Sequence, residues 1–227
     1  TLQMERRGRR TARAARSVCY TAVVSLQLPV IHAPVSDRHD VTTGVWCGVP
    51  EANDELPVRA EVLRAACAAA GAPIVPAVAH GPEPLLRVHE PRFLEVLRTA
   101  HDWWVRDGHL EVPGNPYVTG YFFPGVAGRH GGRPDRPAAT IRAEIGRYAM
   151  DTLTTIGAGT WEGAVAAADA ALTATDLVLG GTKLAYAICR PPGHHAGPAF
   201  FGGSCYLNNA AIAAAQKLPR CAIGKKY

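Results

Sequence analysis

Two adjacent histidines, His194 and His195, are the side chains in this sequence whose types and setting most favour chemistry. They lie in the loop RPPGHHAG, residues 190–197, which directly follows an apolar run, and the stretch FGGSCYLNN, residues 201–209, comes soon after. Loops at strand ends commonly carry catalytic side chains, because a rigid scaffold positions them. Imidazole gains and loses a proton near neutral pH, so the pair could take a proton from water and give one to a leaving group, or it could bind a metal.

The residues around the histidines favour acid and base roles over a shared metal, because adjacent residues in an extended loop point in different directions. A turn that carries two solvated histidines is the simpler alternative. Pro191 and Pro192 restrict the backbone, while Gly193 permits an unusual dihedral angle or a close approach. The glycine pair at 202–203 lets main chain come near a ligand. We therefore expect a rigid loop that holds two imidazoles in a set geometry.

The elements that must position this loop alternate between strands and helices. Short apolar runs predict strands at 22–31, 74–78, 184–189 and 220–223. Helical periodicity predicts helices that begin near Pro57, Pro91 and Thr160, with further helices at 141–156 and 207–218. In open α/β sheets the ligand site lies at the carboxyl ends of the strands, and the strand at 184–189 ends just before the histidines. The sequence thus predicts an α/β fold, a parallel sheet with helices on both faces.

The helix faces and several polar residues give more local expectations. The inner face of the first helix should contain Val58, Val62, Ala66 and Ala69, and that of the second Phe93, Leu97, Ala100 and Trp104. Thr160 is a candidate N-cap, and the strand at 184–189 should be covered on both faces. Residues 44–53 are expected to form an irregular loop. His89 and His101 are expected to be surface or capping histidines rather than metal ligands.

The positive charge of the chain is concentrated at its start. The net charge is +5, and the first 17 residues hold six arginines against one acid, Glu5. The remaining chain has 18 basic and 18 acidic residues, which argues against general binding of nucleic acid. We expect residues 1–21 to be a basic, disordered leader and residues 22–227 to form one domain. An organellar transit peptide, or nucleic-acid binding through this leader, is an alternative.

The cysteines and the hydropathy pattern bear on the compartment. Six cysteines are scattered without a C-x-x-C pair, which favours free thiols and a reducing, cytoplasmic setting over a disulfide framework or a zinc finger. No run approaches the roughly eighteen consecutive apolar residues of a membrane span, so no membrane association is expected.

The loop sequence resembles a known family. RPPGHHAG followed by FGGSCYLNNAAIAAA is similar to the active-site loop of the zinc-dependent deacetylases, which include class II histone deacetylases and bacterial acetylpolyamine amidohydrolases. The likeness to the acetylpolyamine branch is closer, because four further stretches match its pattern in order. These stretches are 56–61, 88–94, 145–148 and 159–162.

The resemblance implies an arginase/deacetylase-type α/β fold and hydrolysis of an acetyl-amide to acetate and a free amine. In that family a zinc ion polarises the acetyl carbonyl and activates water, and tandem histidines flank this water as general base and electrostatic or acid partners. His194 and His195 would take these roles. Gly203 matches a residue beside the narrow acyl tunnel. Residues 112–138, rich in glycine and proline, match an insertion that builds a homodimer and narrows the entrance.

Two departures from the family pattern matter. Ser204 stands where the family usually has an aromatic tunnel wall, which puts the acyl preference in doubt. The family's zinc ligands, an Asp-x-His and a later Asp, and its transition-state Tyr would follow residue 223, and none of them is present. His32, Asp37 and His39 could be considered as substitutes, but their spacing does not require it.

The resemblance therefore predicts an amino-terminal portion of a deacetylase, with zinc expected for the full-length family member and none for this chain alone. We expect negligible deacetylase activity and, because a sheet edge would be unpaired, reduced solubility. A non-catalytic remnant that binds acetylated ligands or pairs with another subunit is the alternative. A ureohydrolase of the same fold class is weaker, because the dihistidine loop does not suit it.

Overall fold

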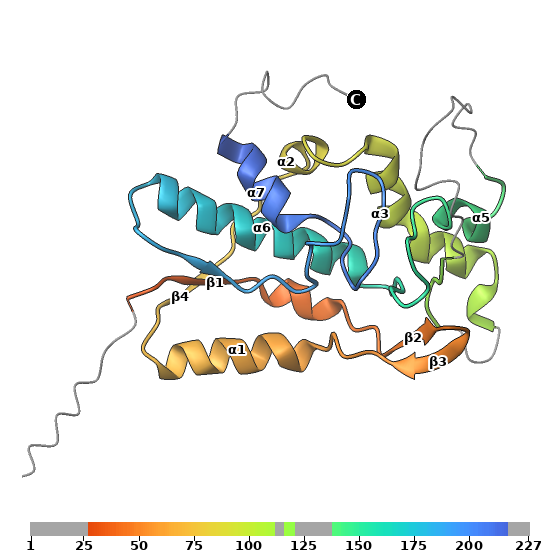
Figure 1. The fold of residues 1–227 in the computed structure, drawn as a ribbon, viewed down its shortest axis with the longest axis horizontal. Helices are drawn as coiled ribbons and strands as arrows, with labels where there is room; N and C mark the ends of the chain where they lie inside the picture. Colours follow the sequence, from red (N-terminus) through yellow and green to blue (C-terminus); the bar gives the residue numbers. More distant parts are fainter. Residues whose placement is uncertain (1–26, 112–115, 121–137, 218–227) are drawn as a thin grey trace, which may run out of the picture.

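A three-stranded parallel sheet forms the centre of the fold. The structure, a computed structural model, describes residues 27–111, 116–120 and 138–217. Strand β1 (Val30–His32) lies between β4 (Ile74–Pro76) and β5 (Tyr186–Ala187) and pairs in parallel with both (Figure 1). The predicted α/β architecture with a parallel sheet is confirmed.

Helices cover both faces of this sheet. Helix α1 (Pro57–Ala69) lies on one side and α6 (Thr160–Leu179) on the other (Figure 1). Helix α7 (Asn209–Lys217) packs on α6, and α2 (Glu83–Leu86) packs on α7. The main core lies on the α6 side, and large buried side chains from α3 (Pro91–Arg106), α5 (Ile141–Ile145) and α6 meet the segment after the dihistidine loop there.

Helix α3 follows its sequence pattern. Its predicted inner face, Phe93, Leu97, Ala100 and Trp104, is fully buried. The apolar positions recur at three and four residues and the opposite face is strongly polar, so only one orientation buries them. In such a helix the amphipathic pattern decides the packing.

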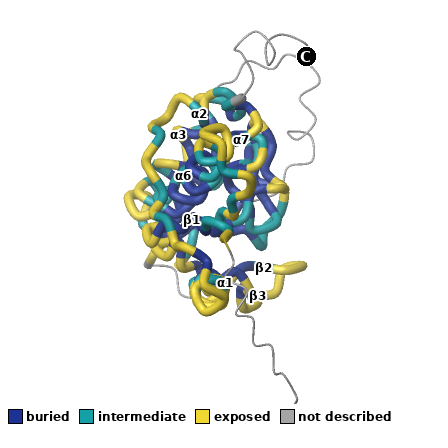
Figure 2. The backbone as a smooth tube through the Cα atoms, turned by 90° about the vertical axis from the view of Figure 1, so that its left-hand side faces the viewer, coloured by how far each residue is buried: buried dark blue, intermediate teal, exposed yellow. Residues whose placement is uncertain are grey.

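Helix α1 begins at Pro57 as predicted, but the predicted inner face is wrong. Val58 and Val62 are 53% and 61% exposed, and Ala66 and Ala69 are also exposed. The side that meets the sheet instead buries Ala60, with Cys67 partly buried beside it. The helix contains seven alanines and valines, so several of its faces are apolar and periodicity alone does not choose among them. Figure 2 shows the resulting exposed surface along α1.

Residues 44–53 form a hairpin and not the predicted irregular loop. Strands β2 (Thr43–Trp46) and β3 (Val49–Ala52) pair antiparallel around a two-residue turn, Cys47 and Gly48, with φ of 50° and 84°. Two successive positive φ angles are what a tight hairpin turn requires, and a glycine supplies the second at little cost. The signal was weak because this hairpin is mostly exposed and does not alternate apolar with polar residues.

Two further expectations need correction. The helix predicted at 141–156 ends at Ile145 as α5, and the apolar side chains that follow, including Tyr148 and Ile156, are buried from irregular backbone. The N-cap of α6 is Gly159, and the Thr160 hydroxyl instead accepts the Gly157 N–H. The apolar residues after Ile145 recur at helical spacing because they pack into the core, although their backbone is not helical.

The strands are shorter than predicted. The first begins at Val30, and β5 has two residues, Tyr186 and Ala187. Leu184 is 70% exposed, so the apolar run before the loop is not covered on both faces. Among the described residues, β5 has a single neighbouring strand, β1.

Several predicted regions lie outside the described residues: the leader 1–21, the strand at 220–223, and all of 112–138 except 116–120 and 138. Four cysteines are described, Cys47, Cys67, Cys189 and Cys205, and all are free thiols. In the part of the chain that is described, no helix has the length and apolar character needed to cross a membrane.

Candidate active site

The dihistidine loop follows β5, where the sequence placed it, and both imidazoles are exposed to solvent. The ring centroids of His194 and His195 lie 4.3 Å apart, and the ring planes are inclined by 47°. The expectation that the two side chains point apart is wrong, because the chain turns at these residues instead of running extended. The turn brings both imidazoles to one place on the surface.

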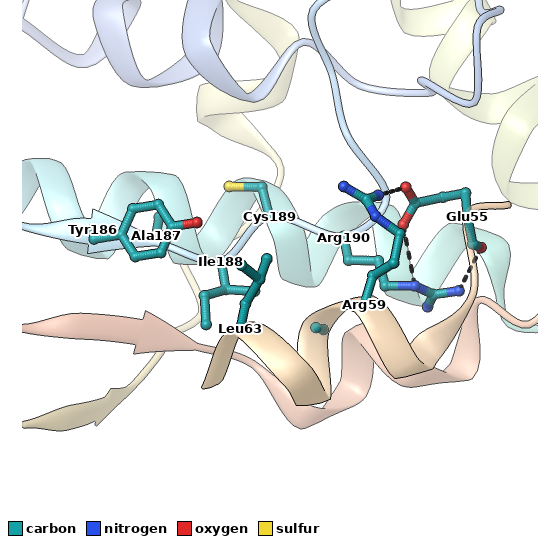
Figure 3. A pocket seen from close by; sticks show the side chains of 9 residues that line it. Glu55, Arg59, Leu63, Tyr186, Ala187, Ile188, Cys189 and Arg190 are labelled. Carbon is teal, nitrogen blue, oxygen red and sulfur yellow. Dashed lines mark hydrogen bonds and ion pairs between the residues drawn. The ribbon is translucent and has the colours of Figure 1, made fainter. Parts of the chain in front are cut away.

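Arg190 anchors the start of the loop. Its side chain is 2% exposed, and it donates to the carbonyl oxygens of Ser36 at 3.1 Å and Glu55 at 2.9 Å. Its Nε also lies 3.2 Å from the Glu55 carboxylate, which binds Arg59 as well, and Figure 3 shows both guanidinium groups in contact with Glu55. Burial lowers the pKa of Arg190, while the charge of Asp37 opposes that shift. One buried guanidinium thus ties the loop to two segments more than 130 residues earlier.

A cavity of about 170 Å³ lies beside this anchor. It runs along the segment from Tyr186 to Arg190, and the α1 residues Ala60 and Leu63 also line it. Figure 3 shows Leu63 beside this segment. Neither imidazole of the loop lines it. The cavity and the two imidazoles are therefore separate features. Arg190 connects them, because it lines the cavity and begins the loop.

The far end of the loop is held by the start of α7. The Asn208 side chain donates to the Ala196 carbonyl at 2.8 Å, and the Asn209 side chain donates to the Pro191 carbonyl at 3.3 Å. A Cβ atom on Gly193 would lie 2.3 Å from the carbonyl oxygen of Leu207. Gly193 is thus required for a close approach of two backbone segments, which is one of its two predicted roles.

His89 is a structural residue of the same loop. It is 2% exposed, its Nδ1 lies 2.9 Å from the Gly197 carbonyl, and its Nε2 accepts the Asn208 N–H at 3.0 Å. These partners fix the neutral ring with the proton on Nδ1. Burial lowers the pKa of His89 to about 4. The expectation of a surface or capping histidine is wrong, because its two partners come from segments that only the fold brings together.

The glycine turn packs directly against the second histidine. Gly203 and Ser204 have φ of 56° and 61°, and a Cβ on Gly203 would lie 2.5 Å from the His195 ring. The structure therefore brings Gly203 against His195. Asp151 and Thr154 accept the N–H groups of Gly203 and Ser204. Sequence reasoning missed both residues, since they lie in irregular backbone without a motif.

A neutral layer lies beneath the loop. His39 is 1% exposed, bonds to the Thr160 hydroxyl at 3.0 Å, and meets the ring of Tyr206 edge-on at 5.1 Å. Burial and the positive charge of Arg190 lower the pKa of His39 to about 3. Burial also raises the pKa of Tyr206, whose hydroxyl donates to the Thr155 carbonyl. These groups stay uncharged at neutral pH and support the loop by packing.

The described residues do not fit a catalytic zinc ion. No group of three His, Cys, Asp or Glu side chains within residues 27–111, 116–120 and 138–217 could hold a metal. His32 and His39, considered as substitutes, are both buried, and no such group forms around Asp37. Zinc usually requires three or four such ligands at about 2 Å.

Comparison with known proteins assigns the family. Residues 48–224 match the histone deacetylase domain. Acetylpolyamine amidohydrolase 1 of Pseudomonas aeruginosa is 43% identical over 134 residues, which are 59% of this chain and 36% of the relative. Acetylpolyamine amidohydrolase of Mycoplana ramosa is 39% identical over 167 residues, which are 73% of this chain and 46% of the relative.

A solved structure gives the same result. The acetylpolyamine aminohydrolase from Burkholderia pseudomallei superposes with a TM-score of 0.72 at 32% identity, over 84% of this chain and 53% of that chain. The chain thus spans about half the length of that structure and less than half of the two curated relatives. From the matched domain and the shared arginase/deacetylase-type fold, this chain belongs to the histone deacetylase family.

Proposed function

We propose that this chain carries the proton-transfer and acyl-lining half of an amidohydrolase that removes acetyl groups from acetylated amines. The observation that supports it best is the pair of imidazoles 4.3 Å apart, with the ring of His195 packed on Gly203. His194 and His195 are the proposed catalytic residues. Gly203 and Ser204 are the proposed substrate-lining residues, and Ser204 leaves a smaller, more polar wall than an aromatic side chain.

The proposed chemistry is hydrolysis of an amide. As water adds to the acetyl carbonyl, one imidazole takes its proton; the carbon–nitrogen bond then breaks as a proton is delivered to the amine nitrogen. Two imidazoles at one place can divide these steps, which is the usual contribution of general acid–base catalysis. The names of the relatives support an acetylpolyamine as substrate, and acetyl-lysine is the other substrate proposed.

We further propose that a complete family member uses zinc and that residues 1–227 alone hold none and are inactive. The lack of a metal-holding group among the described residues supports this. The test is the zinc content of the purified chain after zinc loading, together with acetate release from acetylputrescine. We expect less than about 0.1 zinc per chain and no turnover, because a site that lacks its ligands does not retain the metal. One zinc per chain with turnover would contradict the proposal.

The positive test is a hybrid chain. This chain would be joined, at the end of its match to the Mycoplana ramosa relative, to the part of that relative that follows the match. The hybrid is expected to release acetate, and His195→Ala is expected to lower kcat at least about 100-fold, as loss of an acid or base group does. His101→Ala, on α3, is the matched control and should change kcat little. Equal activity of the His195 variant and the hybrid would overturn the assignment.

A second candidate is a non-catalytic module that binds acetylated ligands or pairs with another subunit. The same lack of a metal-holding group among the described residues favours it. Binding of acetylputrescine by the metal-free chain, measured by calorimetry, with no turnover in the hybrid would support this candidate over the enzyme.

Two further proposals concern assembly and compartment. A homodimer built through residues 112–138 is expected for a complete protein, and sedimentation of the hybrid with and without this segment tests it. The four cysteines within the described residues, all free thiols, support a reducing, cytoplasmic setting. Cell fractionation that found the protein in an oxidising compartment would contradict this.

A further inference from the structure

We infer that Asp151 and Thr154 are positioning residues that hold the glycine turn at 202–204 against the imidazole of His195. This inference rests on the proposed role of His195 in proton transfer. It concerns two residues that no sequence motif singles out. They act through the turn and do not touch the reacting atoms.

Three donors converge on the Asp151 carboxylate. The Gly203 N–H donates to Oδ2 at 2.5 Å, the Thr154 hydroxyl donates to Oδ2 at 3.1 Å, and the Thr154 N–H donates to Oδ1 at 2.7 Å. The Thr154 hydroxyl in turn accepts the Ser204 N–H at 2.8 Å. Two successive backbone N–H groups, those of Gly203 and Ser204, are thereby captured by one connected pair of side chains.

The conformation of the turn explains why such a pair is needed. Ser204 has a φ of 61°, a region that residues other than glycine rarely adopt and that costs on the order of 1 kcal/mol. Consecutive residues with positive φ direct their N–H groups to one side, which favours a negatively charged acceptor there. The Asp151 carboxylate supplies that acceptor, and the hydroxyl of Thr154, which is 1% exposed, supplies the second. A hydrogen bond to a charged acceptor is roughly twice as strong as a neutral one.

The turn has little freedom on its other side. A Cβ on Gly203 would lie 2.5 Å from the Cδ2 atom of His195, and one on Gly202 would lie 2.0 Å from the Cγ atom of Met150. The Gly203 backbone is therefore in van der Waals contact with the imidazole. Because His195 is otherwise exposed, this contact limits the orientations of its ring. Releasing the two N–H groups would let the turn move away and free the ring.

The Asp151 carboxylate is better placed to hold the turn than to bind an amine substrate. Both of its oxygens already accept hydrogen bonds, and the three donors all come from the protein. A cationic ligand would compete with these contacts for the same oxygens. The geometry thus assigns Asp151 to the scaffold of the site.

The test measures amide hydrogen exchange and the His195 ring by NMR in the 227-residue chain. In Asp151→Asn and Thr154→Val, the amides of Gly203 and Ser204 are expected to exchange about five- to tenfold faster, the loss of one hydrogen bond of ordinary strength. The Cε1–H resonance of His195 should shift in both variants. Thr154→Ser keeps the hydroxyl and should restore both signals. Thr152→Val is the matched control, because its hydroxyl donates to Val45 on β2 and not to the turn.

The hybrid chain adds a kinetic arm. There, Thr154→Val is expected to lower kcat about tenfold with little change in KM, because a misoriented ring slows proton transfer without removing a substrate contact. Unchanged exchange of the Gly203 and Ser204 amides, or an unchanged His195 resonance, in both variants would overturn the inference. If the unmodified hybrid shows no turnover, the proposed function fails, and the positioning role is decided by the NMR arm alone.

Discussion

Acidification from pH 7 to pH 5 should destabilise this protein through two buried histidines, His39 and His89. Their folded-state pKa values, about 3 and about 4, lie below the ordinary value of 6.5, with burial as the main cause. For a group whose pKa is lowered by folding, the neutral form is favoured in the native state. Its stabilising contribution is complete above pH 6.5 and is lost as the pH falls towards the folded pKa, because the unfolded chain binds the proton first.

The magnitude follows from these values. Between pH 7 and pH 5 the unfolded histidine becomes almost fully protonated, while His39 and His89 stay almost fully neutral in the native state. Each therefore removes about 2 kcal/mol from the free energy of unfolding, and together they remove about 4 kcal/mol. That is a large part of the 5 to 15 kcal/mol typical of a domain, so roughly the whole margin of a weakly stable chain is at risk.

The assay is guanidinium unfolding, followed by tryptophan fluorescence, at pH 7 and pH 5. His39→Asn and His89→Gln remove one titrating ring each, so each variant should lose about half of the pH-dependent change whatever its absolute stability. His101→Gln, on helix α3, is the control, because it leaves both buried histidines in place, and it should keep the change. Burial also lowers the pKa of His32, so a smaller loss of the same sign should remain. The reasoning is refuted if the double variant loses as much stability on acidification as the unmodified chain.

Four further substitutions, one of them a control, test the loop and the sheet edge. Gly193→Ala forces a methyl group against the carbonyl of Leu207 and should cost about 2 to 4 kcal/mol in denaturant unfolding; a cost below about 1 kcal/mol would show that the loop relaxes. Arg190→Lys cannot reach both backbone carbonyls and the carboxylate at once, so it should cost about 2 to 4 kcal/mol, whereas Arg59→Lys, half exposed on the same Glu55, should cost less than about 1 kcal/mol. If both variants lost the same free energy of unfolding, the buried guanidinium of Arg190 would contribute no more than the half-exposed one of Arg59. Leu184→Lys should leave stability within about 0.5 kcal/mol and reduce light scattering at high concentration, and unchanged scattering would locate the association surface elsewhere.

The sequence was most informative where local chemistry agrees with the packing. The alternation of strands and helices predicted the parallel sheet, and the strict stripe from Phe93 to Trp104 predicted both the extent and the buried face of α3. It failed where periodicity is ambiguous. In α1, alanine and valine make several faces apolar, and the sheet selected the one that carries Ala60. The β2–β3 hairpin gave a weak pattern for another reason: it is mostly exposed, so its residues do not alternate between apolar and polar.

The candidate site likewise has features that the sequence determines and features that only the tertiary structure determines. The sequence by itself determined where the imidazoles, the prolines and the glycines lie, because those residue types restrict the backbone or transfer protons whatever surrounds them. Only the tertiary structure decided what holds them: Arg190 reaches back to Glu55, His89 joins Gly197 to Asn208, and Asp151 captures Gly203. Hydrogen bonds between residues about 50 to 135 positions apart leave no periodic trace in a sequence, since each depends on a distance that the fold alone sets.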